Sequence, residues 1–187
     1  MLNISVDEVV YGYHIGVFPM ADPDMPGIIN WYEPINRGII PLSGLKVSKS
    51  LKKTIEKEIF NVSFNQDFAQ VISQCAAREE TWISKEIIAV YTELFEQGLA
   101  HSVEVWMDNK LVGGLYGVAL GKAFFGESMF HHATDASKVA LVALVAWLKE
   151  NGFMLLDTQY ITPHLASMGA IEIPQKEYLK LLKKALQ

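Results

Sequence analysis

Residues 101–131 read HSVEVWMDNKLVGGLYGVALGKAFFGESMFH, and this stretch decides the fold. Apolar side chains alternate with small or polar ones, which is the two-residue period of a β-strand. The alternation is interrupted at Asp108-Asn109 and at Gly121-Lys122, and both pairs suit tight hairpin turns. The stretch therefore predicts three consecutive antiparallel strands. The glycines of VGGLYG lie inside the middle strand and indicate a flexible or closely approached backbone, not a phosphate-binding loop.

A helix is expected directly after these strands, over residues 135–151. Its segment VALVALVAWL is apolar on every side, so the helix should be buried between a sheet and other helices. Gly152 ends it, and FMLLDTQ then predicts another strand. Thr162-Pro163 begins a short helix, and Pro174 opens the last one.

Three more helices are expected before residue 101, each preceded by a side chain that can cap it. Ser48 precedes KSLKKTIEKE, and Asn65 or Asp67 precedes FAQVISQCAAR. Ser84 precedes a helix whose apolar residues recur every three or four positions as far as Gly98, which suits a left-handed C-terminal cap. A short strand is expected at residues 62–64.

The first 45 residues differ in composition from the rest of the chain. They are rich in Gly, Pro and aromatic residues, as in GVFPMADPDMPGIINWYEPINRGIIPL, which is typical of loops and short extended segments. We expect little regular helix there. We therefore divide the chain into a small loop-rich N-terminal part, residues 1–45, packed against a larger α/β body, residues 46–187.

The overall composition excludes several classes of protein. The chain has 187 residues, half of them apolar, with 16 Lys and Arg against 21 Asp and Glu. At a net charge of −5 it does not coat DNA, and an RNA partner would need a local basic patch. The single cysteine, Cys75, cannot form an internal disulfide, and neither a secretory leader nor a membrane-spanning apolar run is visible. These features favour the cytoplasm.

Two polar motifs follow apolar strand residues and are candidates for catalysis. In a strand, Asp157 and Gln159 of DTQ point to the same face and could address one substrate together. The apolar residues before Asp157 and before Glu127 would place both carboxylates at the edge of the interior, where a raised pKa helps a base accept a proton. The alternative is that both are structural carboxylates. Four apolar residues could line a nearby pocket or simply belong to the core: Leu115, Met129, Leu141 and Leu144.

A lysine-rich segment could contact RNA. Four lysines recur at steps of three and four positions: Lys46, Lys49, Lys53 and Lys57. On a helix they would form one stripe, with Lys52 beside it, suited to phosphates, but a merely solvated helix face is the alternative. The histidines lack the i, i+4 spacing of a helical zinc site, so no metal is expected.

The chain contains, in this order, SVEVW, LVGGLYG, FFGESMF, ASKVAL, DTQ, HLASMGA and EIP, and before them YGYHIGVFPM, WYEPINRGIIPL, VSKSL, FNQDFAQVI and TWI. In these motifs, which cover nearly the whole chain, it resembles the leucyl/phenylalanyl-tRNA-protein transferases. The resemblance implies an α+β fold similar to the acetyltransferase (GNAT) fold, with a mixed, mainly antiparallel sheet. It also implies an enzyme that moves Leu or Phe from charged tRNA to the N-terminal amine of proteins beginning with Arg or Lys, marking them for degradation.

The same resemblance implies roles for single residues. Asp157 and Gln159 match a proton-relay pair, and Glu127 matches an active-site acid. Trp82 of TWI matches a ring close to the aminoacyl-adenosine. The remaining substrate-binding positions are Leu115, Met129, Leu141, Leu144, Met20 and Tyr13, and the tRNA-binding positions are Lys46, Lys49, Lys52 and Lys53. No metal or redox cofactor is implied.

Met20 stands where the family usually has Trp, and Leu144 where it often has Phe. Both differences remove aromatic surface, which leaves the preference among Leu, Phe and Met open.

Two other enzyme functions and a non-catalytic one remain as alternatives. An acyl-CoA-dependent N-acyltransferase of the same fold is disfavoured, because ESMFHHATDASK lacks the Gly-rich turn that cradles a pyrophosphate. The same transfer with a changed acceptor preference, such as acidic N-termini, is a second alternative. A catalytically silent binder of charged tRNA is a third, without positive support in the sequence.

Overall fold

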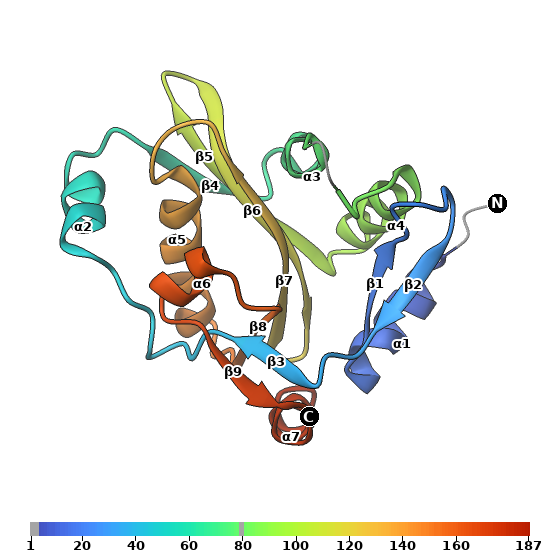
Figure 1. The fold of residues 1–187 in the computed structure, drawn as a ribbon. Coiled ribbons are helices and arrows are strands. Elements are labelled where there is room, and N and C mark those ends of the chain that lie inside the picture. Colours follow the sequence, from blue (N-terminus) through green and yellow to red (C-terminus); the bar gives the residue numbers. More distant parts are fainter. Residues whose placement is uncertain (1–3, 79–80) are drawn as a thin grey trace.

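A seven-stranded sheet runs through the centre of the protein (Figure 1). In this computed structural model, residues 4–78 and 81–187 are described. In spatial order the strands are β4 (Asn61–Phe64), β5 (Ala100–Met107), β6 (Lys110–Leu120), β7 (Ala123–His131), β8 (Leu155–Gln159), β3 (Asn36–Ile39) and β9 (Ile171–Pro174). Neighbouring strands are antiparallel except β7 and β8, which are parallel. The predicted mixed, mainly antiparallel sheet is confirmed.

The three strands predicted from residues 101–131 are β5, β6 and β7. Asp108-Asn109 forms the first turn, and both residues have the positive φ angles, 51° and 60°, that tight hairpins require. Gly121-Lys122 forms the second turn. The close approach expected at the glycines is also present, since a Cβ on Gly113 would lie 2.5 Å from the Cβ of Ala136.

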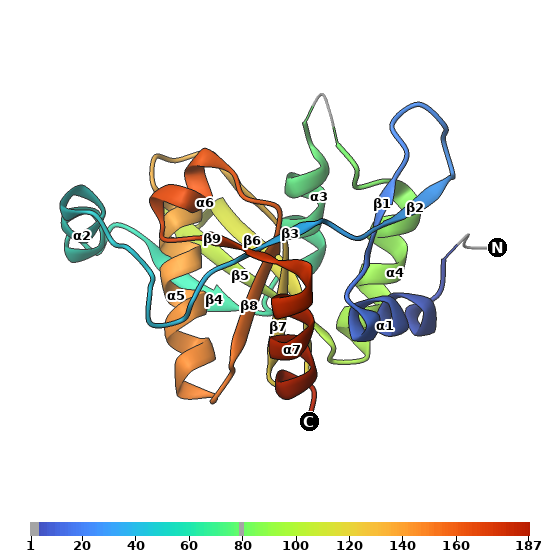
Figure 2. The ribbon, with the colours of Figure 1, turned by 60° about the horizontal axis from the view of Figure 1, so that its bottom comes forward.

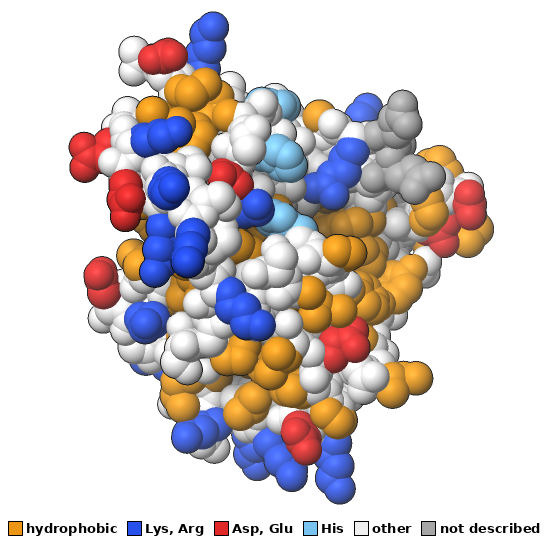
Figure 3. Space-filling model, turned by 60° about the vertical axis from the view of Figure 1, so that its left-hand side comes forward, with side chains coloured by type: hydrophobic (Ala, Val, Ile, Leu, Met, Phe, Trp, Pro, Cys, Tyr) orange, Lys and Arg blue, Asp and Glu red, His pale blue; other side chains and the backbone are white. Residues whose placement is uncertain are grey.

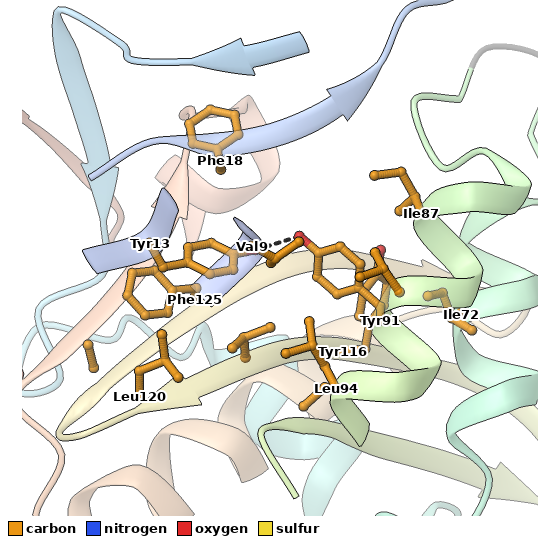
Figure 4. Packing of buried hydrophobic residues seen from close by; sticks show 14 of the residues in the cluster. Val9, Tyr13, Phe18, Ile72, Ile87, Tyr91, Leu94, Tyr116, Leu120 and Phe125 are labelled. Atoms are coloured by element: carbon orange, nitrogen blue, oxygen red, sulfur yellow. Dashed lines mark hydrogen bonds between the residues drawn. The ribbon is translucent and has the colours of Figure 1, made fainter. Parts of the chain in front are cut away.

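Helices cover both faces of the sheet, and each face has its own apolar core (Figures 1 and 2). One face carries α5 (Ala136–Glu150), with α2 (Lys49–Glu56) and α6 (Pro163–Ser167) beside it. The other face carries α1 (Val6–Ile15), α3 (Phe68–Ala76), α4 (Lys85–Glu96) and α7 (Gln175–Ala185). Figure 4 shows the second core, where tyrosines from three elements meet above the sheet.

The predicted helix starts are confirmed by hydrogen bonds. The side chains of Ser48, Asp67 and Ser84 accept backbone N–H groups in the first turns of α2, α3 and α4. Gly98 has a φ of 74°, as expected after α4. The prediction that the helix over residues 135–151 is buried between a sheet and other helices is only partly right. One side of α5 packs against the sheet, but Ala146 on its outer side is exposed.

The expectation of little regular helix in the first 45 residues is wrong for α1. Ser5 and Glu8 form a reciprocal capping box, with the Ser5 N–H donating to Glu8 Oε2 over 2.8 Å, and Gly16 ends the helix at a φ of 87°. The next residues form a separate two-stranded sheet of β1 (Phe18–Ala21) and β2 (Ile29–Tyr32). These local signals outweigh the loop-like composition.

The lysine stripe is shorter than predicted. The helix α2 covers only residues 49–56, so Lys46 lies before it and Lys57 forms its C-cap. The backbone N–H of Lys46 donates to the carbonyl of Met168, which holds that segment against the end of α6. The described helix therefore carries Lys49, Lys52 and Lys53.

Candidate active site

The strands β7 and β8 separate and open a cavity. Their parallel pairing runs only from Ala123–Leu155 to Phe125–Asp157, and residues 126–131 of β7 continue past it. A cavity of about 750 Å³ is lined by this part of β7 and by the end of β8. Six predicted substrate-binding residues line it: Leu115, Met129, Leu141, Leu144, Met20 and Trp82. The apolar pocket expected beside the polar motifs is therefore present.

A β-bulge directs Glu127 toward the α1 side of the sheet. Tyr116 of β6 pairs with Ser128, whereas Gly117 pairs with Gly126, so Glu127 is an extra residue on β7. Bulges are frequent beside active sites because they redirect a side chain without ending the strand. Glu127 lines the cavity but is only 8% exposed.

Three neutral side chains donate hydrogen bonds to the Glu127 carboxylate. Its Oε1 accepts the hydroxyl of Tyr13 at 2.6 Å and the Nε2 of Gln159 at 2.7 Å. Its Oε2 accepts the hydroxyl of Tyr91 at 3.2 Å. The two hydroxyls also lie 2.5 Å apart, which is the contact drawn between Tyr13 and Tyr91 in Figure 4. The elements α1, α4 and β8 thus converge on one carboxylate.

Glu127 has no cation among its described partners, so no positive charge offsets the cost of burying its carboxylate. Burial raises the pKa of Glu127 to about 7, and the negative charge of Asp157 adds to the rise. The hydrogen bonds from Tyr13, Gln159 and Tyr91 act in the opposite direction but do not cancel the cost of burial. A carboxylate with a pKa near 7 can both accept and release a proton at physiological pH.

Asp157 lies behind Glu127 in a fully enclosed ion pair. Its Oδ2 accepts the Nη2 of Arg37 at 2.7 Å and the hydroxyl of Tyr178 at 2.6 Å, and both members of the pair are 0% exposed. The Arg37 guanidinium is sandwiched between the rings of Phe18 and Tyr178, with centroids at 4.6 and 4.5 Å. Its Nη1 donates to the carbonyl of Gly16. Asp157 does not line the cavity.

Gln159 links the two carboxylates. Its backbone N–H donates to Asp157 Oδ1 over 2.7 Å, and its side-chain Nε2 donates to Glu127. Its φ is 61°, in the left-handed region that non-glycine residues rarely adopt. Such a conformation persists where surrounding contacts hold it, and the Asp157 hydrogen bond is such a contact.

The predicted site residues divide into three groups in the structure. Glu127 and Gln159 lie in the cavity with the apolar set, whereas Tyr13 and Asp157 reach them from behind. The four lysines proposed for tRNA lie outside the cavity, on α2 and the segment before it: Lys46, Lys49, Lys52 and Lys53.

Sequence reasoning missed Arg37, Tyr91 and Tyr178 as site residues, because their neighbours in sequence do not mark them as partners of the two carboxylates, although Arg37 lies within the quoted motif WYEPINRGIIPL. It also missed the polar lining of the cavity. The described residues include four buried side-chain polar atoms without a hydrogen-bond partner, and three of them belong to residues that line the cavity: Tyr116, Thr158 and His164. Unpartnered buried polar atoms are rare in proteins, so their concentration here favours a ligand-binding site.

Metal ligation and membrane insertion find no support in the part of the chain that is described. No group of three or more His, Cys, Asp or Glu in residues 4–78 and 81–187 is arranged to hold a metal ion. None of the described helices has the length and apolarity needed to cross a bilayer.

Solved structures identify the class of fold. A GCN5-related glucosamine N-acetyltransferase region of a fungal multi-domain GH3 β-N-acetylglucosaminidase superposes with a TM-score of 0.52 at 10% identity, covering 76% of this chain and 20% of that one. The fold is therefore GNAT-like, as the sequence resemblance implied.

Sequence comparisons identify the family. Residues 39–183 match the family model described as leucyl/phenylalanyl-tRNA protein transferase, and residues 3–35 match the model for its N-terminal domain. The leucyl/phenylalanyl-tRNA–protein transferase of Herpetosiphon aurantiacus is 54% identical, covering 99% of this chain and 96% of that protein. The corresponding protein of Chlorobaculum tepidum is 48% identical, covering 98% and 96%. The chain belongs to this family and is an aminoacyltransferase.

Proposed function

We propose that the protein transfers leucine or phenylalanine, and also methionine, from charged tRNA to the N-terminal amine of proteins that begin with Arg or Lys. The reaction would take place in the bacterial cytoplasm and mark the acceptor for N-degron degradation. One observation carries the proposal: the cavity places an apolar wall next to a buried carboxylate whose pKa burial raises to about 7. Family membership favours aminoacyl-tRNA over acyl-CoA as the donor.

The apolar wall suits the side chain of the donor amino acid. Leu115, Leu141 and Leu144 come from β6 and α5 and are almost fully buried. They offer dispersion contacts and no hydrogen-bond partner, so an unbranched-at-Cβ apolar side chain is favoured over a polar one. Met20 and Met129 add flexible thioethers to the wall, which can adapt to Leu, Phe or Met.

The carboxylate suits the attacking amine. An N-terminal amine has an ordinary pKa of about 8, so it is mostly protonated at neutral pH and must lose a proton before attack. We assign Glu127 the receipt of this proton, because it is the carboxylate among the described residues that line the cavity. The free amine then bonds to the ester carbonyl carbon, the ester C–O bond breaks, and the terminal ribose hydroxyl of the tRNA leaves with a proton.

Asp157 and Gln159 have a supporting part in this proposal. The sequence-based hypothesis assigned the proton to Asp157 with Gln159. Since Asp157 is fully buried against Arg37, we assign it the positioning of Gln159, which in turn orients Glu127. Lys49, Lys52 and Lys53 would contact phosphates of the acceptor stem.

The experiment is transfer of labelled Leu, Phe and Met from charged tRNA to peptides that start with Arg, Lys, Asp or Ala. Transfer to the Arg and Lys peptides alone supports the proposal. Transfer to the Asp peptide would mean a changed acceptor preference, and tRNA binding without transfer would mean a silent binder. A parallel reaction with acetyl-CoA as donor should give no product.

A further inference from the structure

Three histidines gather around the mouth of the cavity. His131 ends β7, His132 follows it, and His164 lies on α6, and all three line the cavity. We call them the histidine cluster. Figure 3 shows histidine side chains in one band, with Lys and Arg side chains on both sides of it. Neither the fold nor the proton transfer to Glu127 accounts for this cluster.

Among the described residues that line the mouth, the charged and ionisable groups are cationic or can become so. Besides the histidine cluster, Arg78 lines the cavity, and its Nη2 donates to Ser128 Oγ and to the carbonyl of Met129, which orients the guanidinium. Among the described lining residues the single carboxylate is Glu127, which lies inside with its own hydrogen bonds. In a chain of net charge −5, this local excess of cationic and cationisable groups marks an anion site.

His164 lacks the partner that an anion would supply. Its Nε2 is buried and has no hydrogen-bond partner in residues 4–78 and 81–187, although the residue lines the cavity. Burial lowers the pKa of His164, and the positive charges of Lys138 and His131 lower it further. An anion placed among these groups would accept a hydrogen bond from Nε2 and offset their mutual repulsion.

The lysine-bearing helix α2 contacts the start of α5. Asp135, just before α5, accepts Lys138 Nζ at 3.0 Å and the Thr54 hydroxyl of α2 at 3.1 Å, so these contacts connect the lysine-bearing helix to the start of α5. A polyanion that lies on α2 and ends in the cavity would pass the histidine cluster on its way.

We propose that the histidine cluster binds the phosphodiester on the 5′ side of the donor's terminal nucleotide. This rests on the proposed function, which places the aminoacyl ester in the cavity. The phosphate nearest to that ester is one nucleoside away, so it reaches the mouth when the acyl group lies against the apolar wall. Arg78 adds a positive charge, and the histidines add ring N–H groups that can donate to phosphate oxygens.

Two probes separate phosphate binding from binding of the rest of the donor. One is adenosine carrying phenylalanine through a stable 3′-amide, which has no phosphate. The other is the cytidylyl-(3′→5′)-adenosine form of the same compound, which has one phosphodiester. The variants are His131→Asn with His164→Asn, and the control is His14→Asn, since His14 is exposed on α1 and does not line the cavity.

At about pH 6 the unaltered protein and the control should bind the phosphate-bearing probe about tenfold more tightly than the phosphate-free one. The double variant should lose this preference and keep its affinity for the phosphate-free probe. Glu127, Arg78, Lys138 and Asp135 are unchanged in all three proteins, so the preference that the double variant loses measures the share of the histidines alone.

Three results would overturn the inference. If the double variant kept the preference, the phosphate would lie elsewhere, and if it lost affinity for both probes equally, the histidines would only shape the cavity. Failure of the unaltered protein to bind either probe would reject the proposed function and this inference together. Normal transfer with an unchanged preference in the variant would reject the inference alone.

Discussion

Replacing Arg37 by Met should lower the free energy of unfolding by about 3–5 kcal/mol, the cost of leaving one member of a buried ion pair without its partner. Both Arg37 and Asp157 are 0% exposed, so water cannot replace the lost cation. The Gly16 carbonyl loses its donor as well. Met keeps an apolar side chain between the rings of Phe18 and Tyr178, so the change removes charge and hydrogen bonds more than volume.

The measurement is urea unfolding at neutral pH, with two further variants. Lys138→Met breaks the partly exposed pair with Asp135 and should cost only about 0–1 kcal/mol. Combining Arg37→Met with Asp157→Asn removes the uncompensated charge and should recover part of the loss. Two results would refute the conclusion that Arg37 and Asp157 form a buried pair whose members depend on each other. One is a loss of unfolding free energy for Arg37→Met no larger than for Lys138→Met. The other is a loss in the double variant equal to the sum of the losses in the two single variants.

Three further predictions follow from the site and the lysine helix. Glu127→Gln should lower kcat by about 10²–10⁴-fold and remove the part of the fall in rate below about pH 7 that protonation of Glu127 is expected to cause in the unaltered protein, as a pH series of transfer rates would reveal. Burial raises the pKa of Glu127 from 4.5 to about 7, so the protonated side chain stabilises the folded state most below about pH 4. This contribution is lost as the pH rises through 7, and the free energy of unfolding should fall by about 3 kcal/mol. Urea unfolding at low and high pH should show this fall in the unaltered protein and not in Glu127→Gln. Lys49→Glu should weaken binding of all charged tRNAs alike and reduce the salt dependence of binding, whereas Lys176→Glu, exposed on α7, should bind as the unaltered protein does.

Local signals predicted most of the fold. Ser48, Asp67 and Ser84 each cap the helix that the sequence assigned to them, because a cap depends on only a few neighbouring residues. The same reasoning would have found α1, since Ser5 and Glu8 have the spacing of a capping box. The Gly- and Pro-rich composition of the following residues concealed that signal.

The candidate site was less predictable, because its contacts join distant parts of the chain. Strand alternation placed Asp157 and Gln159 on one face, and the apolar residues before Glu127 indicated its burial. Arg37 is 120 residues away from Asp157 in sequence, and Tyr13 is 114 residues away from Glu127. No local pattern encodes such pairs; they depend on how the first and last segments pack against the sheet.

The different surroundings of Asp157 and Glu127 support different roles for the two carboxylates. Asp157 has a cation, a tyrosine and a backbone N–H as partners and does not line the cavity, whereas the described partners of Glu127 are all neutral donors and Glu127 lines the cavity. The ion pair and the hydrogen bonds hold Asp157 in place, and a desolvated carboxylate such as Glu127 can exchange a proton. Because Gln159 contacts both, a change at Asp157 should reach the substrate through the orientation of Gln159 and the charge that Glu127 senses, and not through loss of a proton acceptor.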